Sequence, residues 1–317
     1  MHARRSIAAL VSLGSLFLAT ACAGDDLAED PEGTPETSEG GGGEVSISGQ
    51  AFPEAELVAA MYAQLLEDAG YTVDVNLVDT RDVYMQQFPG QIDVVPEYVG
   101  GIVDFLNVTE NGPEAESLTT SDAAESISNA QSLLETKGIT LLEPSAATDT
   151  NAFFVTQEYS EQNDVTRLSD LEGETVTLAA APDCEDRADC GGGLSDVYGI
   201  DIKEVLPLGF ASPQTYQSVL DGESQLGLTS TTDGTLESQG LVLLEDDQAI
   251  QPAQNLVPAV STEFLDANPE VADPLNALMA ALTTEALTEL NGRVAVDRET
   301  AEDVARDFLV EQGLLDG

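Results

Sequence analysis

The sequence predicts an α/β fold in two lobes, and three observations support this class. Short runs rich in β-branched residues alternate with segments whose apolar residues recur at helical spacing. Strands that alternate with helices favour largely parallel sheets. The chain has 317 residues, of which 42% are hydrophobic, which is enough for a sizeable core and for more than one domain. We expect two lobes because a chain of this length divides naturally into two domains, and clefts between domains are where ligands usually bind.

The first half of the chain contains two predicted helices and three predicted strands. A helix over 54–69 has apolar residues at every third or fourth position and ends at Gly70. A second helix over 122–137 begins with the capping pair Asp122 and Glu125, and a glycine closes it. The strands are expected at 45–47, at 73–77 and at 92–95, the last of them stopped by Pro96.

The second half repeats this alternation. The strands are expected at 152–156, 175–180 and 226–228. The helices are expected at 169–171, 214–220, 269–290 and 299–312. No repeat at a solenoid period is found, so a repeat architecture is not expected. The α/β prediction therefore applies to the whole folded part.

The N-terminal residues are an export signal. Two arginines precede an apolar stretch at 7–21 that is too short to cross a membrane comfortably and that ends in small residues. The segment LATAC at 18–22 resembles the lipobox of bacterial lipoproteins, although alanine stands where leucine is commonest. We expect a signal peptide at 1–21 and a lipid on Cys22 that holds the protein on the outer face of the cell membrane. Residues 22–44 are acidic and end in a glycine run, which predicts a flexible linker.

The charge of the chain is strongly negative. Ten Lys and Arg residues stand against 59 Asp and Glu residues, which leaves −49 with histidine neutral. Such a field opposes binding to nucleic acid and favours cationic or zwitterionic partners. A second interpretation is that the acidity serves solubility alone in salty surroundings, where screening relieves the self-repulsion.

The composition also disfavours catalysis. The one histidine, His2, lies in the predicted signal peptide, so histidine-based triads and His-containing zinc sites are excluded from the mature chain. Carboxylate-only hydrolysis and magnesium sites remain possible. We find neither a dinucleotide-binding glycine motif nor a phosphate loop. We therefore assign no catalytic residue, no metal ligand and no cofactor.

Two cysteines remain if Cys22 is lipidated. Cys184 and Cys190 lie close together in a glycine-rich segment. Outside the cytoplasm such a pair is typical of a disulfide, and two free thiols are the alternative. A metal site would need further soft ligands, which the sequence lacks.

Several short sequence motifs, distributed over nearly all of residues 45–316, follow one another in an order and spacing that can be compared with a known family. They include GQAFPE at 49–54, GQID at 90–93, PEYVG at 96–100, TTDG at 231–234 and LLEDD at 243–247. Together they resemble the substrate-binding proteins of ABC importers for quaternary-ammonium osmoprotectants such as glycine betaine, carnitine and choline.

The resemblance implies a bilobal, type II periplasmic-binding-protein fold. Lobe one would be discontinuous, at 45–150 and 253–317, and lobe two would span 151–252. A ligand would bind between the lobes, and the closed form would deliver it to the permease. The expected function is that of an extracytoplasmic solute-binding lipoprotein without enzymatic activity.

The resemblance also implies a ligand site made of an aromatic cage and a polar clamp. A trimethylammonium group donates no hydrogen bond, so ring faces hold it at about 0.5–2 kcal/mol each, and a ligand carboxylate needs an arginine, hydroxyls or backbone N–H groups. Two rings of the family's cage are missing or displaced, because Ala152 follows Asn151 and no tyrosine precedes Thr232. The expected ligand-binding residues are Gln50, Phe52, Arg81, Glu97, Tyr98, Asn151, Arg187, Tyr216, Thr231, Thr232 and Asp233.

Several of these residues have a purely structural alternative. Tyr98 matches a cage position but would also fit the core, although its place after Pro-Glu indicates an exposed loop tip. Arg81 and Arg187 are candidate carboxylate clamps, and for Arg187 a surface ion pair with Asp186 or Asp189 is the alternative. The Asp233-Gly pair is also an ordinary turn. We expect Glu97 to face the site, and we expect Asp93 to cap adjacent backbone.

Three other functions remain open. The first is a binding protein of the same fold for a different zwitterionic or aromatic cation. The second is a surface adhesion lipoprotein, which would have no saturable small-ligand site. The third is a carboxylate-based enzyme on a similar scaffold.

Overall fold

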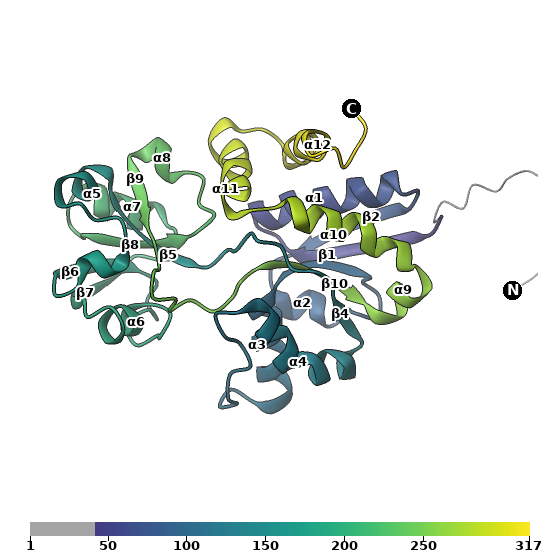
Figure 1. Ribbon diagram of the computed structural model, residues 1–317, viewed down its shortest axis with the longest axis horizontal. Coiled ribbons are helices and arrows are strands. Elements are labelled where there is room, and N and C mark those ends of the chain that lie inside the picture. Colours follow the sequence, from purple (N-terminus) through teal and green to yellow (C-terminus); the bar gives the residue numbers. More distant parts are fainter. Residues whose placement is uncertain (1–41) are drawn as a thin grey trace, which may run out of the picture. The chain divides into compact units, whose positions relative to one another are not determined.

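Two five-stranded sheets organise residues 42–317, the part of the chain that the computed structural model describes (Figure 1). The predicted signal peptide, Cys22 and most of the predicted linker lie outside the described residues. Gly40–Gly317 form one compact unit. We call the part built on the first sheet lobe one and the part built on the second sheet lobe two.

The first sheet has the strand order β2-β1-β3-β10-β4. Its strands are β1 (Glu44–Gln50), β2 (Thr72–Val78), β3 (Val94–Tyr98), β4 (Ile139–Leu141) and β10 (Leu256–Ser261). β1 runs parallel to β2 and β3, whereas β10 runs antiparallel to β3 and β4.

The second sheet has the strand order β7-β6-β8-β5-β9. Its strands are β5 (Asn151–Thr156), β6 (Thr175–Ala180), β7 (Asp201–Pro207), β8 (Leu226–Ser230) and β9 (Leu241–Leu244). β6 runs parallel to β7 and β8, whereas β5 runs antiparallel to β8 and β9.

Both sheets are therefore mixed, and the expectation of largely parallel sheets is wrong for half of the strand pairs. The antiparallel pairs all involve β5 or β10, the strands through which the chain enters one lobe or returns to the other. Such a strand is not preceded by a crossover helix of the same sheet, so nothing requires it to run parallel to its neighbours.

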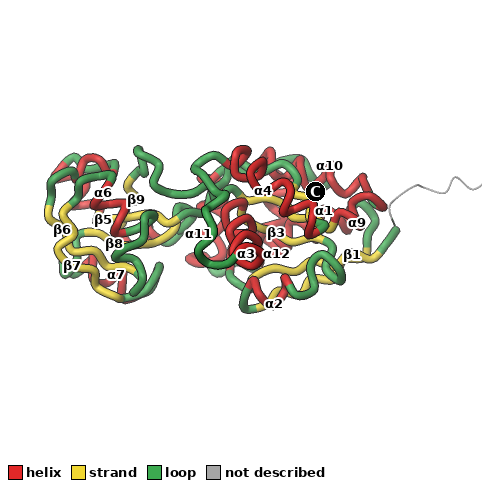
Figure 2. Tube along the Cα trace, turned by 90° about the horizontal axis from the view of Figure 1, so that it is seen from below, coloured by secondary structure: helices red, strands yellow, loops and turns green. Residues whose placement is uncertain are grey.

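Helices cover the two faces of the first sheet, as the secondary-structure colours of Figure 2 show. One core cluster packs against the helices on one face, and a second cluster, with Ile102, Leu106 and Leu134, lies on the other. The helices of lobe one are α1 (Pro53–Asp68), α2 (Arg81–Met85), α3 (Val99–Asn111), α4 (Ala123–Lys137), α9 (Thr262–Ala267), α10 (Ala272–Ala281), α11 (Thr284–Gly292) and α12 (Ala301–Glu311).

Lobe two has short helices and two core clusters of its own. Its helices are α5 (Gln157–Asn163), α6 (Gly191–Asp196), α7 (Pro213–Leu220) and α8 (Leu236–Gln239), with a 3-10 turn at Leu168–Leu171. Cys184 and Cys190 are joined by a disulfide and are buried in the larger cluster, beside α6. Phe154 belongs to the smaller cluster with residues of α7 and α8.

The predicted helix over 122–137 is confirmed, with its caps. The Asp122 side chain accepts a hydrogen bond from the Glu125 N–H, and Gly138 takes a left-handed conformation with φ of 71°. None of the described helices has the length and apolar character needed to span a membrane.

Two predicted boundaries are wrong. β3 continues through Pro96, because Pro96 lies opposite Pro258 in the antiparallel pair and neither residue has an N–H to donate. The expected long helix over 269–290 is broken between α10 and α11, where Leu282 is extended and the Thr283 hydroxyl accepts a hydrogen bond from the Ala286 N–H.

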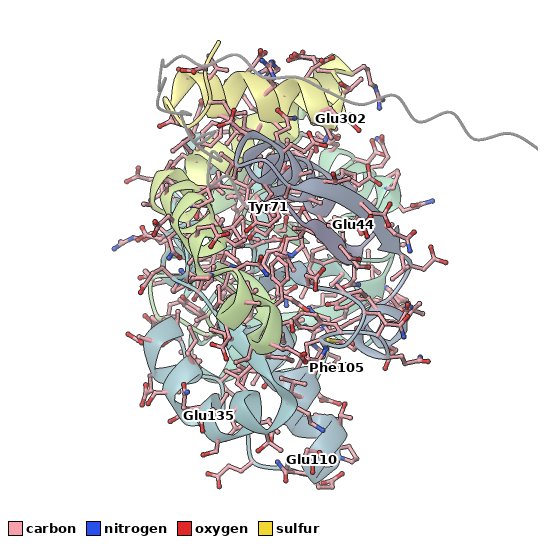
Figure 3. All side chains as sticks on the ribbon, turned by 90° about the vertical axis from the view of Figure 1, so that its right-hand side faces the viewer. Glu44, Tyr71, Phe105, Glu110, Glu135 and Glu302 are labelled. Carbon is pink, nitrogen blue, oxygen red and sulfur yellow. A yellow bond between two sulfur atoms is a disulfide. The ribbon has the colours of Figure 1, made fainter. Side chains whose placement is uncertain are left out.

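The carboxylates are spread over the surface rather than gathered at one place. In Figure 3, Glu110 and Glu135 project from α3 and α4, and Glu302 lies on α12 at the other end of the view. All three residues are exposed. This distribution agrees with a role of the acidity in solubility.

Candidate functional site

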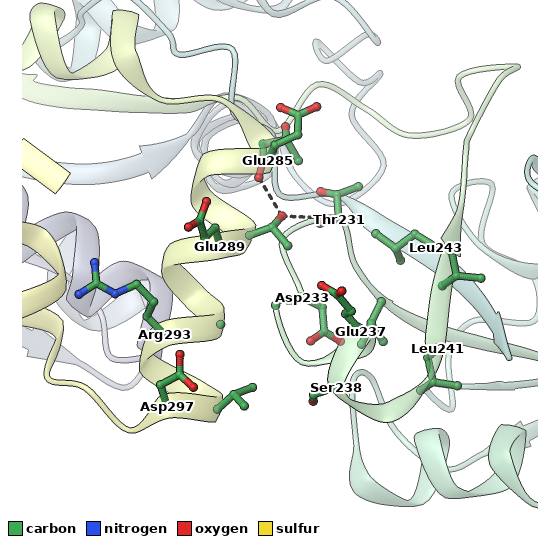
Figure 4. A pocket seen from close by; sticks show the side chains of 17 residues that line it. Thr231, Asp233, Glu237, Ser238, Leu241, Leu243, Glu285, Glu289, Arg293 and Asp297 are labelled. Atoms are coloured by element: carbon green, nitrogen blue, oxygen red, sulfur yellow. Dashed lines mark hydrogen bonds between the residues drawn. The ribbon is translucent and has the colours of Figure 1, made fainter. Parts of the chain in front are cut away.

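One pocket lies between residues of lobe one and lobe two. Its volume is about 1180 Å³. It is lined by residues of the segment 231–243 in lobe two and of the segment 284–297 in lobe one (Figure 4). Its lining combines leucines with carboxylates and contains no aromatic side chain. Among the predicted ligand-binding residues it includes only Thr231 and Asp233, so this pocket is not the ring cage that the sequence predicts.

A second meeting point of the lobes is centred on Glu54. Glu54 lies in the first turn of α1, where a carboxylate is favoured, and is 5% exposed. Its carboxylate accepts hydrogen bonds from the Tyr98 hydroxyl and, at 2.6 Å, from Asn291 Nδ2. Asn291 Nδ2 also donates to the backbone oxygen of Thr232 at 3.0 Å, which connects Glu54 to lobe two.

Asp149 adds a second carboxylate at this junction. Its Oδ1 atom is buried and has no hydrogen-bond partner among the described residues. Burial is the main cause that raises the pKa of Asp149 from 3.8 to about 7, and the charge of Glu54 is the second. Hydrogen bonding by the Ser230 and Thr232 side chains lowers this pKa and offsets part of the rise. The charge of Glu54 thus acts on Asp149, and a cation beside the two groups would relieve their repulsion.

Two aromatic rings border the same junction. The ring centroids of Phe52 and Tyr98 are 6.4 Å apart, and the ring planes are inclined by 25°. Burial, followed by the charges of Glu54 and Asp149, raises the pKa of Tyr98 well above its ordinary value, so its hydroxyl remains a donor. The structure thus brings Phe52, Tyr98 and Thr232 together around Glu54.

Arg81 is already paired with a carboxylate. Its Nε and Nη2 atoms lie 2.9 Å from the two oxygens of Glu97, and the Tyr84 hydroxyl bonds the same carboxylate. Glu97 is 1% exposed and Arg81 22% exposed. Glu97 therefore takes part in a buried ion pair, in which Arg81 is the more exposed partner.

Arg187 is held by the disulfide loop to which it belongs. Its guanidinium binds both oxygens of Asp189, at 2.9 and 2.6 Å, and makes a longer contact of 3.3 Å with Asp183. Asn151 Nδ2 donates to the same Asp189 carboxylate at 2.9 Å. The structure thus brings Arg187 and Asn151 together through Asp189.

Tyr216 and Asp233 form a group within lobe two. The Tyr216 hydroxyl donates to Asp233 Oδ2 at 2.6 Å, and the Tyr216 ring packs against Phe154 with centroids 5.3 Å apart. The other Asp233 oxygen accepts hydrogen bonds from the backbone and side chain of Thr235. These contacts stabilise the turn after β8 and do not involve the Glu54 group.

The remaining predicted residues lie at the ends of strands. Gln50 is the last residue of β1 and is partly exposed. The Thr231 hydroxyl donates to the Thr148 backbone oxygen at 2.6 Å, and Thr232 is 2% exposed. Thr231 therefore ties the turn after β8 to a segment that connects the lobes.

Sequence reasoning missed Glu54, Asp149 and Asn291 as members of the junction. The GQAFPE run at 49–54 contains Glu54, and its position at a helix start was the available signal. Nothing in the sequence around Asn291 distinguishes it from other polar residues on a helix surface.

Comparison with known proteins identifies the family that the sequence matches. The model of the substrate-binding domain of ABC-type glycine betaine transport systems matches residues 43–311. The glycine-betaine-binding protein of Pseudomonas aeruginosa is 30% identical over 287 residues, which cover 85% of this chain and 88% of that protein. The glycine betaine-binding protein YehZ of Escherichia coli is 29% identical and covers 85% and 90% of the two chains.

A solved structure described as a glycine betaine/carnitine/choline ABC transporter superposes with a TM-score of 0.72. It is 22% identical and covers 86% of this chain and all of that chain. At this identity the similarity concerns the fold, and it shows the bilobal periplasmic-binding-protein architecture expected from the sequence.

Proposed function

The chain belongs to the family of substrate-binding domains of ABC-type glycine betaine transport systems, and from this premise we propose that it captures a quaternary-ammonium solute, namely glycine betaine, carnitine or choline. It is a substrate-binding protein and not an enzyme. The solute binds between the two lobes and passes to the permease of an importer.

The observation that carries this proposal is the placement of two carboxylates beside two rings. Phe52 and Tyr98 offer ring faces, and each ring attracts a trimethylammonium group by about 0.5–2 kcal/mol. Glu54 and Asp149 place two carboxyl groups where a cation would lie, and a bound cation would favour the ionised form of Asp149. This arrangement supports a cation site even though two rings of the family's cage are replaced.

The polar clamp is assigned to the disulfide loop of lobe two. A ligand carboxylate binds Arg187 in place of the Asp189 carboxylate. The Arg187 side chain is 36% exposed and can therefore be reached. Asn151 donates a hydrogen bond to the same Asp189 carboxylate, so it could donate to a ligand carboxylate that took the place of Asp189. Arg81 is a weaker choice because Glu97 already binds it on both oxygens.

The other predicted residues shape the site. Gln50 borders it at the end of β1, and Thr231, Thr232 and Asp233 hold the turn of lobe two that faces α11. Tyr216 fixes this turn through Asp233.

Export and anchoring complete the proposal. Residues 1–21 direct export, Cys22 carries the lipid, and residues 22–44 tether the folded part to the outer face of the membrane. Lobe one comprises residues 45–150 and 253–317, and lobe two comprises 151–252.

Calorimetric titration tests the proposal. The Gly40–Gly317 unit is titrated in salt with glycine betaine, carnitine, choline and proline betaine, and we expect micromolar binding of at least one. Tyr98→Ala should weaken that binding about fivefold to a hundredfold, whereas Tyr98→Phe, which keeps the ring, should change it little. Tyr159→Ala, in α5, is the control.

If none of the four compounds binds, the proposed quaternary-ammonium ligand is rejected, whereas the family assignment is unaffected. Equal affinity of wild type and Tyr98→Ala would remove Tyr98 from the cage.

A further inference from the structure

The carboxyl ends of β6, β7 and β8 lie at one edge of the second sheet, because β6 runs parallel to both of its neighbours. The disulfide loop follows β6, and the Thr231–Gly234 turn follows β8. We call this edge the carboxyl edge of lobe two. Ligands of open α/β sheets bind outside the carboxyl ends of the strands. The rings of lobe one follow this rule, since Phe52 comes after β1 and Tyr98 is the last residue of β3.

Lobe two offers one exposed aromatic ring. Phe210 is 48% exposed, whereas every other aromatic residue in the described part of the chain is buried or half-buried. Tyr216, the cage ring predicted for this lobe, packs against Phe154 and donates its hydroxyl to Asp233. The Tyr216 ring is thus already in use inside the lobe. An exposed phenylalanine has no polar atom to bind water, so it gains free energy when it is covered.

Phe210 lies on the carboxyl edge, in the short segment between β7 and α7. On one side of it, Gly209 N donates to the oxygen of Ala180, the last residue of β6, at 3.0 Å. On the other side, Ala211 N donates to the oxygen of Leu228 in β8 at 3.2 Å. Phe210 is therefore placed between the strand that leads to the disulfide loop and the strand that leads to the turn beyond β8.

The backbone around Phe210 is fixed and strained. Both neighbours have positive φ, which is 107° at Gly209 and 45° at Ala211. A residue with a Cβ atom rarely adopts such a conformation, and strained residues of this kind cluster at functional sites. Thr215 Oγ1 fixes the segment further by donating to the Gly209 backbone oxygen at 2.7 Å. The Phe210 side chain is thus presented from a preorganised backbone, which reduces the entropy that binding would cost.

The cation site needs a ring from lobe two. A trimethylammonium group is apolar on most of its surface, so rings from one lobe leave part of it uncovered. Lobe one supplies Phe52 and Tyr98. The carboxyl edge of lobe two meets the same group of residues, because Asn291 Nδ2 donates both to Glu54 and to the Thr232 backbone oxygen. The exposed ring on this edge is therefore suited to contact the cation from the other lobe.

We propose that Phe210 is a ligand-binding residue that supplies the lobe-two ring of the cation site, in place of the two rings missing beside Asn151 and Thr232. The trimethylammonium group is then held between rings of both lobes, so its binding favours the closed arrangement. This inference rests on the proposed function and adds one residue to it. If Phe210 is instead covered by a protein partner such as the permease, its removal will leave the affinity for the solute unchanged.

Calorimetric titration of the Gly40–Gly317 unit with the same four compounds tests the ring. Phe210→Ala should raise the Kd of each compound that binds wild type about twofold to thirtyfold. Phe210→Leu keeps much of the apolar volume but has no ring face, so it should raise the Kd as well. Leu220→Ala is the matched control and should leave the Kd unchanged. Leu220 is 42% exposed and ends α7, which leads to the start of β8 at the opposite edge of the sheet.

A fluorescent variant provides a second readout. The chain contains no tryptophan, so Phe210→Trp introduces a single reporter that also retains a ring. Saturating ligand should shift or quench its emission, whereas the emission of Leu220→Trp should not change. Because Phe210 is exposed, wild type and Phe210→Ala should unfold at the same urea concentration. If Phe210→Ala is destabilised, the tryptophan variant decides the case.

The outcomes separate the role of Phe210 from the proposed function. Suppose that wild type binds a compound, that Phe210→Ala binds it with the same Kd, and that the emission of Phe210→Trp does not respond. This result would overturn the role of Phe210 and leave the proposed function intact. Absence of binding of all four compounds to wild type would reject the proposed ligand, and the role of Phe210 with it.

Discussion

Replacing Asp149 with asparagine should stabilise the fold at alkaline pH much more than at acidic pH. Burial and the charge of Glu54 raise the pKa of Asp149 to about 7, whereas the unfolded chain titrates near 3.8. Between these values the folded protein holds a proton that the unfolded chain has released, so this group's contribution to the unfolding free energy falls as pH rises through the window. A shift of about three units corresponds to about 4 kcal/mol at ~1.4 kcal/mol per unit.

Urea unfolding of the Gly40–Gly317 unit at pH 5 and pH 8.5 measures this effect. The window between pH 5 and about 7 covers two units, so the gain from Asp149→Asn should be about 2–3 kcal/mol larger at pH 8.5 than at pH 5. Taking the difference between variant and wild type at each pH cancels the titrating groups that do not interact with Asp149. Asp74→Asn, at an exposed position on β2, is the control. A gain that is the same at both pH values would refute the argument.

Two further predictions concern stability and covalent structure. Arg81→Ala should cost about 3–5 kcal/mol in urea unfolding because it leaves Glu97 charged and buried, whereas Arg167→Ala, at an exposed pair, should cost far less. Equal losses would show that Glu97 is not dependent on Arg81. Thiol labelling of the unfolded, unreduced Gly40–Gly317 unit should modify neither Cys184 nor Cys190, and two labelled sites would contradict the disulfide.

Much of the fold could be predicted because local signals agree with it. The helix over 122–137 has its cap, its closing glycine and its apolar spacing in one short segment, and all three are used in the structure. The direction of β5 and β10 could not be predicted in this way, because it depends on how the chain passes between the two sheets. The end of β3 could not be predicted from Pro96, because a proline is tolerated there only opposite Pro258, which is far away in the sequence.

The site was harder to predict than the fold. A resemblance to a family can mark Tyr98 and Arg187, but their partners Glu54 and Asp189 are chosen by tertiary contact. Asn291 comes from a helix that contributes to the junction through a single side-chain nitrogen. No periodicity or spacing carries that information.

The position of β10 has a consequence for the order in which the protein can fold after export. β10 lies between β3 and β4 in the first sheet, yet it begins at Leu256, after all five strands of the second sheet. Lobe two therefore has all five of its strands once the chain is available as far as Leu244. The first sheet, although its first strand emerges much earlier, has to wait with an open edge beside β3 until the chain returns. The sheet that contains the first strand of the chain is thus the last of the two to be completed.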